Sequence, residues 1–365
     1  MPLSGHLTLA PLALVLYTKA VSATVKVAVL GVGSLGKEHA RIYADLAANG
    51  LVEFAGLHDP DSSAAQRISA QHGVPAFRSV EAAAANADAL SVVTPTITHH
   101  AIAKPLLLLG KHLLIEKPMT ATTAEAGELV QLAQERKLVL QVGHVERFNP
   151  VFRYLEEVVS EPRFIEVHRL SPFPARSTDI GVVLDLMIHD LDLILAFVKA
   201  PLTGLEAVGI PVLSKSEDIA NARLRFANGC VANLTASRIS PERMRKIRVF
   251  SGGARPAYIS LDYRAQEGFI YRLAGEAEKE SSLFKKLLAG SSSAIVSEFA
   301  GKKIVREPVP VEKDEPLKLE LKSFIECVGS KATPVVSGAS AKRALDLAVE
   351  ITRLIAQNEA AAVRV

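Results

Sequence analysis

The stretch Thr24–Gly36, TVKVAVLGVGSLG, decides the fold of the first half of the chain. Its first seven residues are short, apolar and rich in β-branched side chains, which is typical of a buried parallel strand. They lead directly into Gly31-Val32-Gly33-Ser34-Leu35-Gly36, a G-x-G-x-x-G motif followed by a helical pattern from Lys37 to Ala48. In this context, Gly31 allows a tight turn, Gly33 allows close approach to a pyrophosphate, and Gly36 allows helix–strand packing. The stretch therefore predicts a dinucleotide-binding fold.

The second strand, Val52–His58, ends at Asp59, about 20 residues beyond the glycine motif, where a carboxylate binds the adenosine ribose hydroxyls. A carboxylate repels a 2′-phosphate, so NAD is favoured over NADP. His58 and Arg67 leave some room for that phosphate, and a turn residue in Asp59-Pro60-Asp61 is the competing interpretation.

Helical and apolar strand patterns then alternate up to Val142, which predicts a doubly wound parallel sheet. Ligands bind at the carboxyl ends of the strands in such a sheet. Four polar residues fall at these ends: Thr94, Glu116, Lys117 and His144. Lys117 is either an exposed loop lysine or a group that binds a substrate hydroxyl beside the cofactor.

Length and composition exclude several classes of protein. The chain has 365 residues, enough for two domains, and a net charge of +3, too small to indicate nucleic-acid binding. Two cysteines provide no disulfide framework and no usual zinc site, so we expect no metal and a reducing, cytoplasmic location. We expect no transmembrane helix. Residues 1–23 contain an apolar run, residues 6–16, but no Lys or Arg precedes that run as in a secretory signal, so we interpret them as an N-terminal extension.

The run DIGVVLDLMIHDLDLILAFV, residues 179–198, has helical length and apolar periodicity but contains several ionisable groups. Asp185 and His189 are four residues apart and are predicted to share one helix face. A buried acid–imidazole pair is either structural or serves a ligand. We interpret Asp192 as structural.

After Asn149-Pro150 the pattern favours strands, with an Asn228-Gly229 hairpin signal. We predict a second, α+β domain with a large open, mainly antiparallel sheet, whose free face forms a homodimer or homotetramer. Residues 276–308 are predicted to be a flexible excursion. Two amphipathic helices, residues 316–328 and 339–361, are predicted to pack back on the first domain. The predicted divisions are 1–23, 24–145, 146–335 and 336–365.

Taken together, these motifs resemble the glucose-fructose oxidoreductase/inositol dehydrogenase/rhizopine catabolism (Gfo/Idh/MocA) family of sugar oxidoreductases. The resemblance covers nearly all of residues 24–360 and rests on the glycine motif, Thr94-Pro95 with His99, Glu116-Lys117-Pro118 and Asp185-x-x-x-His189. It implies that Lys117, Asp185 and His189 are catalytic. The expected cofactor-binding residues are Gly31, Gly33, Ser34, Leu35, Gly36, Asp59, Thr94, Pro95, His99, Glu116 and Lys117.

A narrower resemblance, carried by GHVERFNP at 143–150 and DIGVVLDLMIHD at 179–190, is to the branch of UDP-N-acetylglucosamine 3-dehydrogenases. It implies NAD-dependent oxidation of a sugar ring hydroxyl to a ketone, giving a UDP-3-keto sugar. We expect substrate contacts from Arg147, Asn149, Arg176, Asp185 and His189; salt bridges are the competing role for the arginines.

The proposed chemistry has His189, oriented by Asp185, as general base and Lys117 as the group that stabilises negative charge on oxygen. Two alternatives stay open. One is a dehydrogenase of another sugar or polyol, such as inositol or UDP-N-acetylglucosaminuronate. The other is a non-catalytic NAD-binding regulator, which would not need all three residues.

Overall fold

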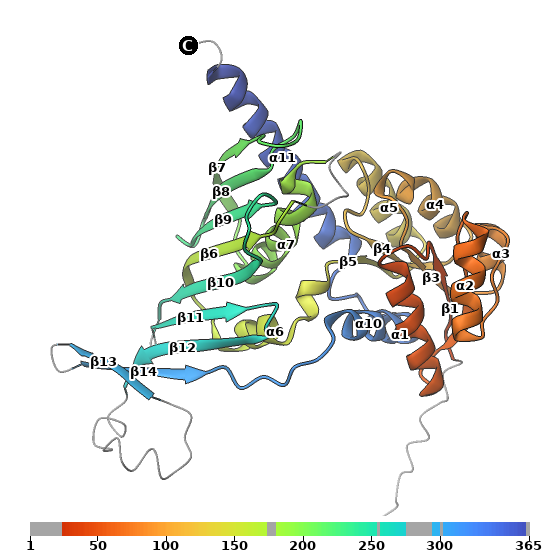
Figure 1. Ribbon diagram of the computed structural model, residues 1–365, viewed down its shortest axis with the longest axis horizontal. Coiled ribbons are helices and arrows are strands. Elements are labelled where there is room, and N and C mark those ends of the chain that lie inside the picture. The colour runs from red at the N-terminus through yellow and green to blue at the C-terminus, as the bar shows by residue number, and fades with distance from the viewer. Residues whose placement is uncertain (1–23, 174–179, 254–255, 275–293, 300–301, 363–365) are drawn as a thin grey trace, which may run out of the picture.

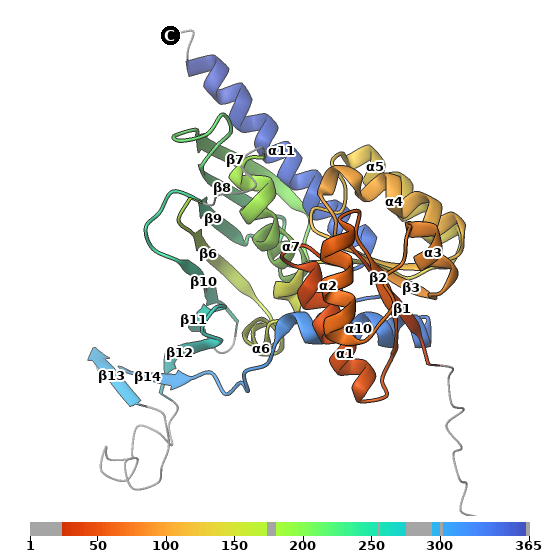
Figure 2. The ribbon, with the colours of Figure 1, turned by 45° about the vertical axis from the view of Figure 1, so that its right-hand side comes forward.

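Two sheets organise the protein, one in each domain (Figures 1 and 2). The computed structural model describes residues 24–173, 180–253, 256–274, 294–299 and 302–362. The predicted extension 1–23 and Arg176 therefore lie outside the described residues.

The first sheet has five parallel strands in the order β2-β1-β3-β4-β5. Alternate residues of β1 face two different cores: Ala28 and Leu30 pack on one side of the sheet, Val27 and Val29 on the other. Both faces are thus buried, which confirms the predicted doubly wound fold. The strands are β1 Lys26–Leu30, β2 Glu53–His58, β3 Ala89–Val92, β4 His112–Glu116 and β5 Leu140–Gly143. The helices are α1 Gly36–Ala48, α2 Ser62–His72, α3 Val80–Ala85, α4 Thr96–Leu108 and α5 Thr123–Glu135.

The second sheet has nine described strands in the order β13-β14-β12-β11-β10-β6-β9-β8-β7. The β6–β9 pair is parallel and the other pairs are antiparallel, as the prediction of a mainly antiparallel sheet requires. The strands are β6 Pro162–Leu170, β7 Leu202–Ile210, β8 Ile219–Phe226, β9 Val231–Ser237, β10 Met244–Ser251, β11 Ala257–Asp262, β12 Glu267–Leu273, β13 Ala294–Phe299 and β14 Lys302–Pro308.

The two faces of this sheet differ. Ile165, Val167, Ile247 and Val249 point inward and are completely or almost completely buried. The helices α6 (Pro150–Val158) and α7 (Ile188–Phe197) lie on the inward side, toward the first domain (Figures 1 and 2). Among the described residues, no helix covers the opposite face (Figures 1 and 2). The prediction of an open sheet is therefore confirmed.

Two local predictions are wrong. Part of the expected flexible excursion, 276–308, forms the strands β13 and β14: β14 pairs with β12 from Phe269↔Pro308 to Leu273↔Ile304, and β13 pairs with β14 at the edge of the sheet. Its polar composition suits an exposed sheet edge. The expected continuous helix at 179–198 begins instead as a π-helical turn, η2 (Val183–Met187), before α7. The rest of the predicted excursion, residues 276–293 and 300–301, lies outside the described part of the chain.

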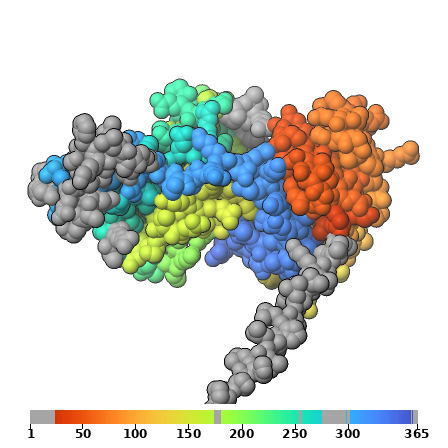
Figure 3. Space-filling view, turned by 90° about the horizontal axis from the view of Figure 1, so that it is seen from below, coloured from red at the N-terminus to blue at the C-terminus, as the bar shows by residue number. Residues whose placement is uncertain are grey.

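The last two helices connect the domains. α10 (Pro316–Ser330) packs on α1 and on the 3₁₀ turn η1 (Val145–Phe148), as predicted for a helix returning to the first domain. α11 (Gly338–Ala362) contacts α5 of the first domain but also α7 and β7 of the second. In Figure 3 the blue C-terminal segments lie between the red-orange first domain and the yellow-green second domain. No described helix is both long and apolar enough to cross a membrane.

Candidate active site

The glycine loop has the geometry that a pyrophosphate site needs. Gly31 has φ of +87°, and a Cβ there would lie 2.4 Å from the Val93 carbonyl oxygen. A Cβ on Gly36 would lie 1.9 Å from the Gly31 oxygen, so helix α1 packs directly on the turn. A Cβ on Gly33, by contrast, would meet no atom within 4 Å. Gly33 therefore faces open space at the N-terminus of α1, where a phosphate is favoured. The loop, including Ser34 and Leu35, fits a dinucleotide.

Asp59 lies at the end of β2, beside this loop. Its Oδ2 accepts a hydrogen bond from Val32 N (2.7 Å), and its Oδ1 accepts one from Asp61 N (2.9 Å). These bonds hold the carboxylate against the glycine loop. They give Asp59 the fixed position that recognition of ribose hydroxyls would require.

His99 joins the two loops that follow β3 and β4. It is completely buried; its Nε2 lies 2.8 Å from the Thr94 carbonyl oxygen, and its Nδ1 lies 3.0 Å from that of Pro118. Burial lowers the pKa of His99. Pro95 precedes the first residue of α4. His99 thus holds the shape of the Thr94-Pro95 and Pro118 loops, which agrees with its predicted role near the cofactor.

Glu116 and Lys117 point in different directions. The Glu116 carboxylate is buried, accepting from His39 Nε2 (3.2 Å) and from the Lys117 backbone N–H (3.2 Å). Lys117 instead reaches the second domain. Its Nζ donates to the Asp185 carbonyl oxygen (2.8 Å) and lies 3.3 Å from Asp185 Oδ1. Two predicted catalytic residues, 68 positions apart in sequence, therefore meet between the domains.

Asp185 and His189 are not paired as predicted. The Asp185 carboxylate pairs with Lys117, and within the described residues no hydrogen bond joins it to His189. Because the turn at 183–187 is π-helical, residues four apart are not stacked as in an α-helix. His189 is partly buried, its Nδ1 has no partner, and its ring meets the His144 ring edge-on at 6.0 Å. Burial, with the charges of Lys117 and Arg169, lowers the pKa of His189 well below its usual range. The lowered pKa favours the neutral imidazole, which is the form that can accept a proton.

The predicted substrate contacts have different positions. Asn149 is buried and caps α6: its Oδ1 accepts from Val151 N, and its Nδ2 donates to Glu146 Oε2 and to the Tyr263 carbonyl. The structure therefore contradicts a substrate role for Asn149, whose polar atoms are already used. Arg147 is largely buried and lies 3.7 Å from Asp192, which has the structural position predicted for it.

One charged cluster beside His189 was not predicted. Arg169 of β6 is 3% exposed; it bonds both Asp190 oxygens at 2.7 and 2.8 Å and Glu146 at 3.2 Å. Arg245 of β10 reaches the same Glu146 at 3.5 Å, and its side chain is 54% exposed. Both arginines occupy inward positions of strands whose alternation is otherwise apolar, which is the signal that was available in the sequence.

Comparison with known proteins accounts for this arrangement. The model of the oxidoreductase family, NAD-binding Rossmann fold, matches residues 25–144, and that of the GFO/IDH/MocA C-terminal domain matches residues 156–252. The chain belongs to the Gfo/Idh/MocA family. It is 36% identical to UDP-N-acetylglucosamine 3-dehydrogenase from Acidithiobacillus ferrooxidans over 324 residues, covering 88% of this chain and 95% of that protein.

A solved structure of UDP-N-acetylglucosamine 3-dehydrogenase GnnA from Acidithiobacillus ferrooxidans has a TM-score of 0.78 and 34% identity. That comparison covers 91% of this chain and 98% of the other. Scyllo-inositol 2-dehydrogenase (NAD(+)) from Bacillus subtilis is 24% identical, with 90% of this chain and 93% of that protein covered. As a Gfo/Idh/MocA protein, this chain is an oxidoreductase acting on CH–OH groups, with NAD as its cofactor and a sugar-type substrate, as predicted.

Proposed function

We propose that this Gfo/Idh/MocA enzyme oxidises a ring hydroxyl of UDP-N-acetylglucosamine, giving the UDP-3-keto sugar. The observation that carries the proposal is the contact of Lys117 with Asp185 next to His189, at the sheet edge that bears the glycine loop. The 36% identity to a UDP-N-acetylglucosamine 3-dehydrogenase over most of both chains supports the choice of substrate.

The roles of the three residues follow from their surroundings. NAD, when bound, supplies the hydride acceptor. His189 takes the hydroxyl proton, and we place its Nε2 toward the substrate because Nδ1 is the buried nitrogen. The Lys117 ammonium stabilises the negative charge that develops on the same oxygen. Asp185 holds Lys117, and not His189, in position.

Arginines near the site are the candidates for the diphosphate of the substrate, because a guanidinium forms two parallel bonds to phosphate oxygens. Arg245 is the most open of those described, with half of its side chain exposed near Glu146. Arg147 is largely buried and pairs with Asp192, so we assign it a lesser part. Arg176 keeps its predicted role as a proposal only, since it lies outside the described residues.

The test is an NADH-forming assay of the purified enzyme against UDP-N-acetylglucosamine, UDP-N-acetylglucosaminuronate and a set of inositols. We expect turnover with the first and little with the others. The variant His189→Ala should lose turnover while its NAD affinity, measured by calorimetry, stays unchanged. A wild-type enzyme that oxidises only inositols would refute the substrate proposal and favour the second candidate, a polyol dehydrogenase like the Bacillus subtilis relative. Binding of NAD with no turnover on any sugar would favour a regulator.

We also propose that the open face of the second sheet joins copies of the chain into a dimer or tetramer. Phe164, Phe250, Tyr258 and Tyr271 stand opposite one another on four neighbouring strands and form a continuous row of stacked or tilted rings. Such a row on a sheet face is an association surface. Light scattering of wild type and of Tyr258→Asp tests this; a wild-type monomer would exclude it.

A further inference from the structure

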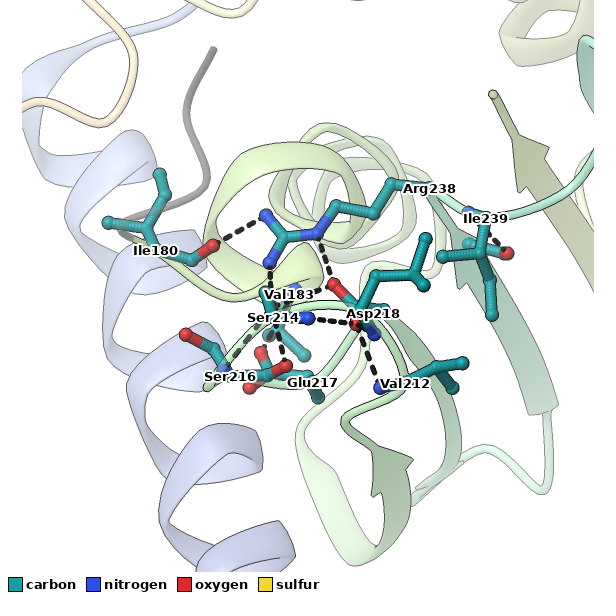
Figure 4. A network of polar contacts seen from close by, with 11 residues as sticks. Ile180, Val183, Val212, Ser214, Ser216, Glu217, Asp218, Arg238 and Ile239 are labelled. Carbon is teal, nitrogen blue, oxygen red and sulfur yellow. Dashed lines mark hydrogen bonds and ion pairs between the residues drawn. The ribbon is translucent and has the colours of Figure 1, made fainter. Parts of the chain in front are cut away.

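The residues just before η2 and α7, the segment that carries Asp185 and His189, contact a buried ion pair from another part of the second domain (Figure 4). We call this segment, residues 183–197, the catalytic segment. Arg238 follows the end of β9 and is completely buried. Its Nε donates to Asp218 Oδ1 (2.8 Å), its Nη2 to Ser214 Oγ (2.7 Å), and its Nη1 to the Ile180 carbonyl oxygen (2.7 Å). The guanidinium thus links Ile180, shortly before the catalytic segment, to the loop 211–218 between β7 and β8.

Asp218 makes that loop rigid. Its Oδ2 accepts from the backbone N–H groups of Val212, Leu213 and Ser214, at 2.6 to 2.9 Å. It has no exposed surface, and the hydrogen bonds lower its pKa against the opposing effect of burial. An ionised carboxylate that accepts from three backbone N–H groups and one guanidinium stabilises this arrangement of the loop.

The neighbouring residue, Glu217, uses this rigid loop to cap the catalytic segment. Its carbonyl oxygen accepts from Val182 N (2.9 Å), and its carboxylate Oε1 accepts from Val183 N (3.3 Å). The carboxylate packs directly on Gly181, where an added Cβ would lie 1.9 Å from Oε1. Two otherwise free N–H groups at the start of the π-helical turn are therefore satisfied by one residue.

Val183, whose N–H group Glu217 caps, lies two residues before Asp185. The Asp185 N–H donates to the Gly181 carbonyl oxygen (3.1 Å), so the capped turn directly carries the carboxylate that holds Lys117. Further along, Met187, Ile188 and Leu191 are buried in the core and anchor the rest of the helix independently. Loss of the cap should therefore displace the turn that carries Asp185 while the fold of α7 persists.

We propose that Glu217, held by the Arg238–Asp218 ion pair, is a positioning residue for the reaction. Glu217 fixes the start of the π-helical turn and thereby the position of Asp185. Asp185 in turn positions the Lys117 ammonium relative to His189. The inference rests on the proposed catalytic roles of these three residues. A misplacement of about 1 Å in a site can lower a rate roughly 100-fold, which is the effect we assign to losing the cap.

The test compares Glu217→Ala with Glu217→Gln and with a matched control, Thr122→Ala. Thr122 caps α5 by accepting from Glu125 N, and α5 carries none of the proposed site residues. We expect Glu217→Ala to lower kcat at least tenfold, with NAD affinity within twofold of wild type. Glu217→Gln, whose amide oxygen can still accept from Val183, should stay within threefold. Thr122→Ala should lower the unfolding temperature and leave kcat unchanged.

A kcat for Glu217→Ala within tenfold of wild type, or a loss matched by Thr122→Ala, overturns the proposal. If Glu217→Ala does not fold, Glu217→Asp, whose shorter side chain cannot reach Val183, is judged by the same criteria. Gly181→Ala tests the contact from the other side: it should slow turnover because its methyl group displaces the Glu217 carboxylate. The double variant Gly181→Ala/Glu217→Ala should then be no slower than Glu217→Ala alone, and additive losses would count against the proposal.

A second measurement does not depend on the substrate assignment. In protein labelled with ¹³C-histidine, the His189 ring signal is identified by its loss in His189→Gln. We expect Glu217→Ala to move this signal and Thr122→Ala to leave it in place. A wild-type enzyme without activity on any sugar tested, combined with this shift, would refute the proposed substrate and support the positioning role. An unmoved signal would refute the positioning role.

Discussion

Replacing Lys117 by Met removes the only described contact that joins the Asp185 carboxylate to the first domain. The Lys117 ammonium donates to the Asp185 carbonyl at 2.8 Å and pairs with the carboxylate at 3.3 Å; the Lys117 side chain is 20% exposed. Met keeps the length and apolar stem of the side chain, so the strand end and its packing should persist. In the proposed mechanism, what is lost is one charged donor at the oxygen that becomes negative during the reaction.

The loss of one such donor lowers kcat by roughly 10²–10³, about 2.7–4 kcal/mol of transition-state stabilisation. We expect this fall in kcat for Lys117→Met, with a smaller change in NAD affinity. Lys111→Met is the matched control. Lys111 precedes the same strand at its opposite end and also donates to a backbone carbonyl, that of Ala87 at 2.8 Å, away from the proposed site. Its replacement should leave kcat unchanged.

The same variant should move the pH profile. Burial is the main cause that lowers the pKa of His189, and the Lys117 charge is the next. A general base acts in its neutral form, so kcat/KM for the sugar at saturating NAD should rise with pH through a pKa below 6.5 and then level off. Without the Lys117 charge, the imidazolium is less disfavoured, the pKa of His189 rises, and the acid limb moves to higher pH.

Steady-state kinetics over a pH series, following NADH absorbance, check both effects. A kcat within tenfold of wild type would show that Lys117 does not stabilise the reacting oxygen. An acid limb that stays in place, or moves to lower pH, would show that the group titrating there is not His189 beside a charged lysine. Lys111→Met should reproduce the wild-type profile at every pH.

Three further predictions concern the cofactor and stability. Asp59→Ala should lower kcat/KM for NAD and raise the preference for NADP, because the variant lacks the carboxylate that we expect to bind the ribose hydroxyls and to repel a 2′-phosphate. Unchanged cofactor preference in kinetics with both cofactors would contradict the assignment. Arg169→Met should lower the free energy of unfolding by about 3–5 kcal/mol in urea titrations, because it leaves the buried Asp190 without its partner; Arg169→Met/Asp190→Asn should recover part of the loss. Glu320 is completely buried, and burial raises its pKa well above 4.5, so the wild type loses stability as pH rises above that value while Glu320→Gln does not. The unfolding temperature of the variant minus that of the wild type should therefore increase from pH 5 to pH 8. A constant difference between the two unfolding temperatures would exclude this titration.

The parts of the structure that depend on local stereochemistry were predictable from the residues alone. The turn at Gly31 requires a positive φ, and Gly36 must lack a side chain, so the G-x-G-x-x-G motif after an apolar strand already determined the dinucleotide fold. Parallel strands end at one edge of the sheet, so the sequence alone places Thr94, Glu116 and Lys117 together. The second sheet followed from residue alternation, which depends only on the period of a strand.

The partner of each polar group was decided by tertiary structure. Helical spacing predicted that Asp185 pairs with His189. In the structure, the π-helical turn and the nearby end of β4 place the Asp185 carboxylate against Lys117 instead. Asn149 is of a residue type that suits a substrate contact but is used as a helix cap. Its amide hydrogens are accepted by Glu146, three residues earlier in the chain, and by the Tyr263 carbonyl, which only folding brings close. Glu217 carries no local signal, since the N–H groups that it caps lie 34 and 35 residues away. Sequence patterns report periods along the chain, whereas a hydrogen bond needs two atoms within about 3 Å of each other, and only folding brings distant residues so close.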